Sequence, residues 1–160
     1  MPEKIKDIKP PRGLTRLGFR LPIQLYRLGL GGVLGKRFVC LTHIGRRSGK
    51  PRQTVLEVVR YDKVIGACIV ASGFGKGSDW LRNVEHDPHI LFTIGRTQRT
   101  GLAERLDPEI AGRELAEYAR RHPLAWRELV QFMGYKVNGT ENDILALGNM
   151  IPLYRFQPNG

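Results

Sequence analysis

Residues 38–61, FVCLTHIGRRSGKPRQTVLEVVRY, decide the fold. Two short apolar runs, at 38–44 and 54–61, lie on either side of a segment rich in glycine and arginine at 45–52. Apolar runs of this length, bounded by glycine and basic turns, are typical of β-strands. Because so short a connection joins them, the two strands are expected to pair antiparallel.

The same pattern continues outward along the chain. Further strands are predicted at 64–71, 90–94, 100–106 and 151–156. Three helices are predicted between them: one from an N-cap at Ser78 to just before Pro88, one from Asp107-Pro108 through Ala119, and one at 123–133. These elements, with short connections between most of the strands, predict an α+β fold: a small β-barrel of antiparallel strands decorated by helices.

Length and charge bound the class of protein. The chain has 160 residues, which fits one domain, and 41% hydrophobic residues, which is enough for a packed core. Its net charge of +11 lies entirely in residues 1–60, which hold 14 basic and three acidic residues. The excess therefore indicates an anionic partner near the N-terminal part rather than a generally basic surface.

The first 35 residues divide into two predicted segments ahead of a predicted barrel domain at 36–160. Residues 1–13 are rich in Lys and Pro and are interpreted as a mobile basic arm. Within 14–35, leucines and arginines recur every three or four residues at 14–28, which predicts a basic amphipathic helix with a kink or a new start at Pro22. This helix either packs its leucines on the core or lies on an anionic membrane surface.

Cysteine and histidine usage indicate neither a disulfide framework nor a metal site. Cys40 and Cys68 lie inside apolar runs and are predicted to be buried free thiols, which favours a reducing, cytoplasmic setting. The basic helix adds a peripheral position on the inner face of the cell membrane as an alternative location. The four histidines form no zinc-ligand pattern with the cysteines. No apolar stretch is long enough to cross a bilayer.

Three common catalytic signatures fail. The sequence around Gly35-Lys36 lacks the spacing of a P-loop, and the glycines at 29–32 and 73–77 lack the spacing of a dinucleotide-binding fingerprint. No GxSxG elbow or Ser-His-Asp arrangement supports nucleophilic catalysis.

Residues 45–52, GRRSGKPR, form the first candidate binding segment. Four cations and two glycines in this predicted turn offer guanidinium forks and backbone amides to a phosphate or a carboxylate. A solvated basic hairpin and a nucleic-acid contact stay open as alternatives, although the loop has no aromatic residues among its cations to stack on bases.

Residues 72–83, SGFGKGSDWLRN, form the second candidate segment. They join a predicted strand to a predicted helix N-terminus, where free amides and the positive helix end face an anion or a polarised carbonyl. Lys76 strengthens that field. Trp80 either packs against a planar ring or belongs to the core.

Together, LTHIGRRSGKPRQT at 41–54 and ASGFGKGSDWLRNVEHDP at 71–88 resemble the deazaflavin-dependent nitroreductase family, whose members bind coenzyme F420 in a split β-barrel. The resemblance covers most of residues 38–156. It implies that Arg46, Arg47 and Ser48 bind the phosphate and acidic tail of F420, with Arg52 assisting. The remaining cofactor-binding residues that it implies are Gln53, Thr54, Ser72, Gly73, Lys76, Trp80 and Leu81.

The resemblance also assigns roles around the ring. Ser72 and Gly73 are expected beside the deazaflavin ring, with Ser72 as the catalytic residue that hydrogen-bonds the ring or the acceptor. Trp80 and Leu81 are expected to flank the ring. Where family members often carry a lysine, this chain has Gly73, and Lys76 is expected to supply the charge instead. In the region where tyrosines line the acceptor pocket of the nitroreductases, this chain has His122, Trp126 and Phe132.

The implied function is hydride transfer from reduced F420 to an electron-poor acceptor such as a quinone, an enone or a nitro compound. The alternatives left open are a deazaflavin carrier without turnover, an FMN-dependent oxidoreductase on the same fold, and a basic nucleic-acid-binding protein. The basic helix makes a membrane-resident quinone a natural acceptor. Both a monomer and a homodimer are compatible with the sequence.

Overall fold

A computed structural model of the chain describes residues 2–4, 35–72, 78–132, 134–137 and 139–159. The predicted amphipathic helix at 14–28 lies outside these described residues, and so do Gly73 and Lys76 of the predicted site. The division of the chain into an arm, a helical segment and a barrel domain therefore stays a prediction.

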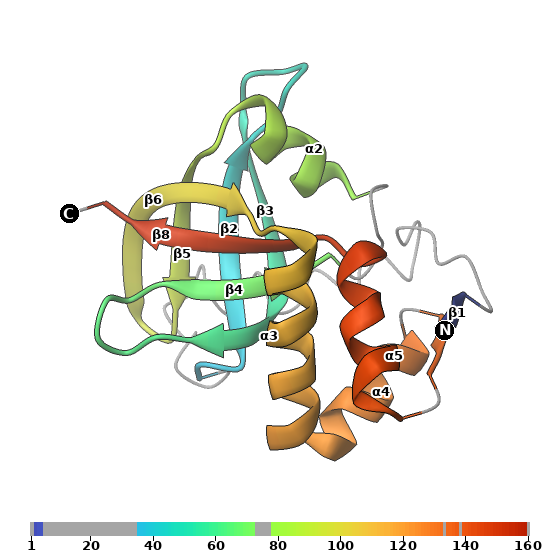
Figure 1. Cartoon of the computed structure of the whole chain (residues 1–160). Coiled ribbons are helices and arrows are strands. Elements are labelled where there is room, and N and C mark those ends of the chain that lie inside the picture. The colour runs from blue at the N-terminus through green and yellow to red at the C-terminus, as the bar shows by residue number, and fades with distance from the viewer. Residues whose placement is uncertain (1, 5–34, 73–77, 133, 138, 160) are drawn as a thin grey trace.

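Six strands close into an antiparallel barrel in the order β2-β3-β4-β8-β6-β5 (Figure 1). Every neighbouring pair is antiparallel. The strands are β2 (Phe38–Ile44), β3 (Pro51–Tyr61), β4 (Cys68–Ala71), β5 (His89–Ile94), β6 (Thr97–Arg105) and β8 (Leu153–Pro158). The predicted fold class, an α+β split barrel with antiparallel strands, is confirmed.

The hairpin that was expected to decide the fold forms the β2–β3 pair. Its register runs from Phe38 opposite Glu57 to Ile44 opposite Pro51. Strand β3 begins three residues before the predicted start at residue 54, because the ladder continues to the edge of the basic loop. The loop is therefore held at both ends by paired strands.

Strand β4 is shorter than the prediction of 64–71, and this prediction was wrong at its N-terminal end. Asp62 closes a turn there, since its carboxylate accepts the backbone N–H groups of Val64 at 2.9 Å and Ile65 at 3.3 Å. Gly66 continues the turn at a φ of +75°. Val64 is 93% exposed, so its apolar side chain belongs to a turn and not to a strand.

In the described part of the chain, four helices lie outside the barrel wall or over its end (Figure 1). They are α2 (Asp79–His86), α3 (Pro108–Arg121), α4 (Pro123–Phe132) and α5 (Glu141–Ala146), the last continuing into the 3-10 turn η3 (Leu147–Asn149). The first three were predicted and α5 was not. A two-stranded sheet pairs β1 (Glu3–Lys4) with β7 (Tyr135–Lys136), which the sequence did not reveal either.

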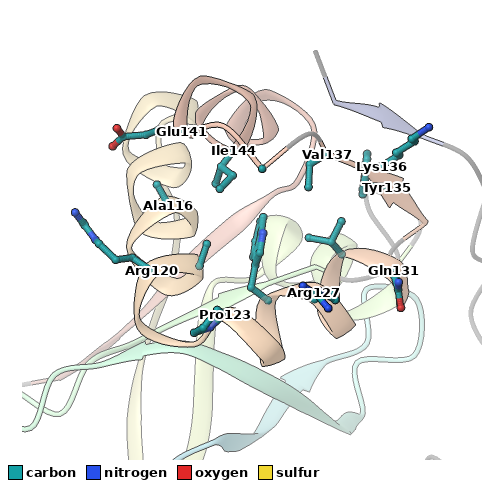
Figure 2. A pocket seen from close by; sticks show the side chains of 14 residues that line it. Ala116, Arg120, Pro123, Arg127, Gln131, Tyr135, Lys136, Val137, Glu141 and Ile144 are labelled. Carbon is teal, nitrogen blue, oxygen red and sulfur yellow. The ribbon is translucent and has the colours of Figure 1, made fainter.

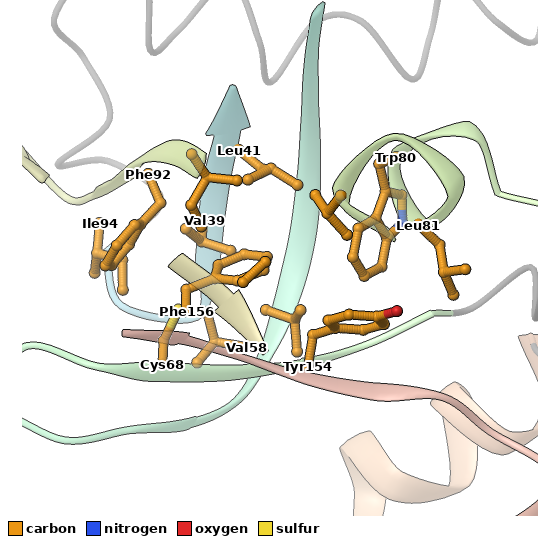
Figure 3. Close-up of a cluster of buried hydrophobic side chains, with 14 residues drawn as sticks. Val39, Leu41, Val58, Cys68, Trp80, Leu81, Phe92, Ile94, Tyr154 and Phe156 are labelled. Atoms are coloured by element: carbon orange, nitrogen blue, oxygen red, sulfur yellow. The ribbon is translucent and has the colours of Figure 1, made fainter. Parts of the chain in front are cut away.

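Two apolar cores share the barrel wall. Alternate residues of a strand face opposite sides of a sheet, so Cys68 and Val70 of β4 point into the barrel while Ile69 points out toward the helices. The inner core also contains side chains from α2, shown in Figure 3. The outer core packs α3, α4 and α5 against the wall. Helix α2 therefore belongs to the barrel, and the other three helices form a separate layer.

Both cysteines are buried and free, as predicted. Burial raises the pKa of the Cys68 thiol to about 12, so this sulfur stays protonated at neutral pH. Among the described helices, none has the length and apolar character needed to cross a bilayer. Within the same residues, no group of three or more His, Cys, Asp or Glu side chains is arranged to hold a metal ion.

Candidate functional site

The loop at 45–50 is a tightly closed hairpin turn. Gly45 donates its N–H to the carbonyl of Lys50 at 2.9 Å, and Gly49 donates to the carbonyl of Gly45 at 2.8 Å. Gly49 has a φ of +68°, a conformation that favours glycine. The Ser48 hydroxyl accepts from the N–H of Lys50 at 3.2 Å. These bonds give the loop one defined backbone path.

Three cations of this segment face solvent. Arg47, Lys50 and Arg52 are exposed. Within the part of the chain that the structure describes, none of the three forms an ion pair. Positive charge that is held on a defined loop and left unneutralised by the protein fits a phosphate or a carboxylate. These residues are the part of the predicted site whose geometry best suits an anion.

Arg46 behaves differently from its neighbours because it turns toward helix α2. Its backbone N–H and its Nη1 both donate to Oδ1 of Asn83, at 3.1 Å and 2.8 Å. Its Nη2 lies 3.6 Å from a carboxylate oxygen of Asp79 in the first turn of the helix. Arg46 thus ties the loop to α2 and has less capacity left for a ligand than Arg47.

His43 contacts Asn83 on the side away from Arg46. It follows Val39 and Leu41 at alternate positions of β2, so its ring points toward the barrel interior and is 4% exposed. Its Nδ1 lies 2.9 Å from Nδ2 of Asn83. Burial lowers the pKa of His43 to about 4, a nearby Asp79 raises it, and Arg52 lowers it further. The ring is therefore neutral at pH 7.

Neither His43 nor Asn83 was among the predicted site residues. The four histidines match no metal-ligand pattern, and the family resemblance assigns no role to Asn83. The signal in the sequence was the alternation of His43 with two apolar residues that face the core.

Ser72 directly follows β4, and its side chain lies beside the N-terminus of α2. It is 1% exposed, its hydroxyl lies 3.1 Å from that of Ser78, and its N–H donates to the carbonyl of Pro152 at 3.0 Å. Ser78 occupies the predicted N-cap position, but its side chain makes no capping hydrogen bond. The structure therefore fixes Ser72 beside the helix N-terminus through a serine pair.

The other predicted site residues are distributed over both faces of the wall. Gln53 and Thr54 are consecutive in β3, so their side chains lie on opposite faces of the sheet. Trp80 and Leu81 are buried in the inner core, where the indole packs edge-on against Tyr154 with ring centroids 5.4 Å apart. Trp80 is thus a core side chain in this structure.

A cavity of about 730 Å³ lies between α3, α4, β7 and the start of α5 (Figure 2). Trp126, one of the residues in the predicted acceptor region, lines it, and His122 is exposed next to α4. Its wall combines apolar side chains with Arg120, Arg127 and Lys136. Because no residue of the basic loop or of the serine pair lines this cavity, it is separate from the candidate site at that loop.

A closed antiparallel barrel of six strands with helices packed around it defines a protein of the split-barrel class. The family model of F420H(2)-dependent quinone reductases matches residues 19–144. The chain belongs to this family. The match confirms the predictions of an F420-dependent reductase and of F420 as its cofactor. It gives no support to FMN, and it does not confirm the nitroreductase name.

Solved structures share the fold at low identity. A protein of unknown function from Agrobacterium tumefaciens has a TM-score of 0.55 and 20% identity; the match covers 97% of this chain and 59% of that one. An F420-H2 dependent reductase has a TM-score of 0.53 and 19% identity, covering 77% and 96%. A chain described as a domain-swapped dimer has a TM-score of 0.55 and 18% identity, covering 91% and 100%. Comparison with curated proteins gives no match.

Proposed function

We propose that the protein transfers a hydride from reduced F420 to a quinone or another electron-poor acceptor, such as an enone or a nitro compound. The observation that carries this proposal is the set of three exposed cations, Arg47, Lys50 and Arg52, on a closed loop beside helix α2. A cofactor with a phosphate and an acidic tail suits such a loop, so the residues present fit F420.

The mechanism assigned to the chain is mainly one of binding and orientation. F420, when bound and reduced, supplies the hydride. Arg47, Ser48 and Arg52 hold the phosphate and the acidic tail, and this remote binding energy orients the ring. Ser72, whose hydroxyl is positioned by Ser78, hydrogen-bonds the ring or the acceptor. Further cofactor contacts are proposed for Arg46, Gln53, Thr54, Gly73 and Lys76. Trp80 and Leu81, which are buried in the inner core, are proposed to support the site rather than to contact the cofactor.

Ring fluorescence of the cofactor tests the proposal. We expect F420 to bind to the purified protein, and FMN and duplex DNA to bind far more weakly. Oxidation of reduced F420 in the presence of a soluble naphthoquinone then separates an enzyme from a carrier. Tight binding of FMN or DNA without binding of F420 contradicts the proposal.

Replacing Arg47 with alanine is expected to weaken F420 binding by tenfold or more. A charge-assisted hydrogen bond contributes about 1.5–3 kcal/mol, and the exposed Arg47 is free to make one. Titration of cofactor fluorescence measures the change, with Arg113→Ala on α3 as a control for loss of one positive charge. If the Arg47→Ala protein binds F420 like the wild type, the loop does not hold the cofactor.

We further infer that the basic apolar pattern at 14–28 attracts the protein to an anionic membrane surface, where a quinone is accessible. The full chain is expected to sediment with vesicles containing anionic lipid, and the triple variant Arg16→Glu, Arg20→Glu, Arg27→Glu is expected to stay in solution. Equal sedimentation of both proteins removes the idea. Light scattering of the purified protein, without vesicles, shows whether the chain forms a homodimer.

A further inference from the structure

Asn83 of α2 connects the basic loop to the rest of the barrel through hydrogen bonds. Its Oδ1 accepts two hydrogen bonds from one residue, from the backbone N–H of Arg46 at 3.1 Å and from its guanidinium at 2.8 Å. The side chain of Asn83 is 4% exposed and comes from the buried face of α2. Arg46, the second residue of the loop, is therefore held by its backbone as well as by its side chain.

The orientation of the Asn83 amide is set by its partners. Arg46 has only donors to offer, so the amide oxygen must face it, and the amide nitrogen must face Nδ1 of His43 at 2.9 Å. An amide nitrogen donates, so Nδ1 must accept and the ring proton must sit on Nε2. The contacts form one directed chain, in which Arg46 donates to Asn83 and Asn83 donates to His43.

We propose that Asn83 and His43 are positioning residues for F420 binding: His43 fixes the Asn83 amide, and Asn83 fixes the loop that presents Arg47, Ser48 and Arg52 to the anionic part of the cofactor. This inference rests on the proposed function of the loop. Neither residue needs to touch the cofactor, because both act through the backbone of Arg46. A pre-positioned loop binds its ligand without first losing conformational entropy.

The structure of the chain predicts different results for different replacements of His43. Leucine fills the space of the ring but offers no acceptor, so the Asn83 nitrogen is left without a partner in a buried place. Asparagine carries an oxygen at about the position of Nδ1 and keeps the acceptor. Only the loss of the acceptor, and not the loss of the imidazole, is expected to loosen the loop.

Fluorescence titration of F420 at a temperature where all proteins are folded tests the proposal. We expect His43→Leu and Asn83→Ala to weaken binding by about tenfold, as loss of the anchoring bonds would. We expect His43→Asn to stay within about threefold of the wild type. In the wild type at pH 7, a long-range ¹H–¹⁵N spectrum should show an unprotonated Nδ1 and a protonated Nε2 on His43.

Two results overturn the proposal. One is equal affinity of the His43→Leu and His43→Asn proteins, whether both are weakened or both unchanged; the other is a proton on Nδ1 of His43 at pH 7. The Arg47→Ala protein separates this failure from that of the proposed function. If Arg47→Ala weakens binding while Asn83→Ala does not, the loop binds F420 but needs no anchor. If Arg47→Ala has no effect, the loop does not bind F420 and both proposals fail.

Discussion

Replacing Phe156 with alanine is expected to lower the free energy of unfolding by about 3–5 kcal/mol, the usual cost of removing a buried phenylalanine ring. Phe156 is 0% exposed in β8 and lies at the centre of the inner core (Figure 3). Its ring contacts Phe92 with centroids 5.8 Å apart and Trp80 with centroids 6.3 Å apart. Loss of the ring therefore leaves a cavity between β8, Phe92 of β5 and Trp80 of α2.

Urea unfolding of the Phe156→Ala protein measures this loss, and Leu124→Ala is the matched control. Leu124 is also a large apolar residue but is 74% exposed on α4, so its removal is expected to change stability by no more than about 0.5 kcal/mol. Similar midpoints for the two variants would show that the aromatic cluster does not hold α2 on the barrel.

The barrel could be predicted from the sequence because its strands are bounded by strong local signals. At 38–61 the apolar runs and the basic turn between them determine both the strands and their antiparallel pairing. The local pattern misled the prediction where a side chain hydrogen-bonds the backbone. At 62–66 an apolar pair looked like strand, but the Asp62 carboxylate binds two backbone N–H groups and makes a turn.

Helix α5 and the β1–β7 pair could not be predicted for a different reason. Helix α5 has only six residues, too few to show a helical period, although Thr140 caps it by accepting the N–H of Asp143 at 3.2 Å. The β1–β7 pair joins residues 3–4 to residues 135–136. A contact across so much sequence leaves no trace in the local pattern of either segment.

The assignment of the candidate site stays a prediction. The composition of two segments and the family resemblance pointed to the basic loop and to Ser72. The chain of contacts behind them was missed, because Arg46 and Asn83 are 37 positions apart and His43 and Asn83 are 40 apart. Only the closed barrel, which carries α2 over the end of β2, brings these three side chains together.

Lowering the pH from 7 to 4 is expected to remove about 3 kcal/mol of folding stability through His43 alone. The unfolded chain takes up a proton on this ring at the ordinary pKa of 6.5, whereas burial lowers the pKa in the folded protein to about 4. Between these values the unfolded state binds more protons. The contribution of His43 is therefore fully present above pH 6.5, is lost as the pH falls toward 4, and changes no further below that.

The difference between the wild type and the His43→Asn protein isolates this effect, since asparagine does not titrate. The carboxylates of Asp87 and Glu117 also have a lowered pKa, because of hydrogen bonds from His89 and Arg120 respectively, but both proteins share them. Between pH 7 and pH 4, the free energy of unfolding of the wild type should fall by about 3 kcal/mol more than that of the variant. Parallel curves would mean that His43 has the same pKa in the folded and the unfolded protein, which would contradict the lowering of its pKa by burial.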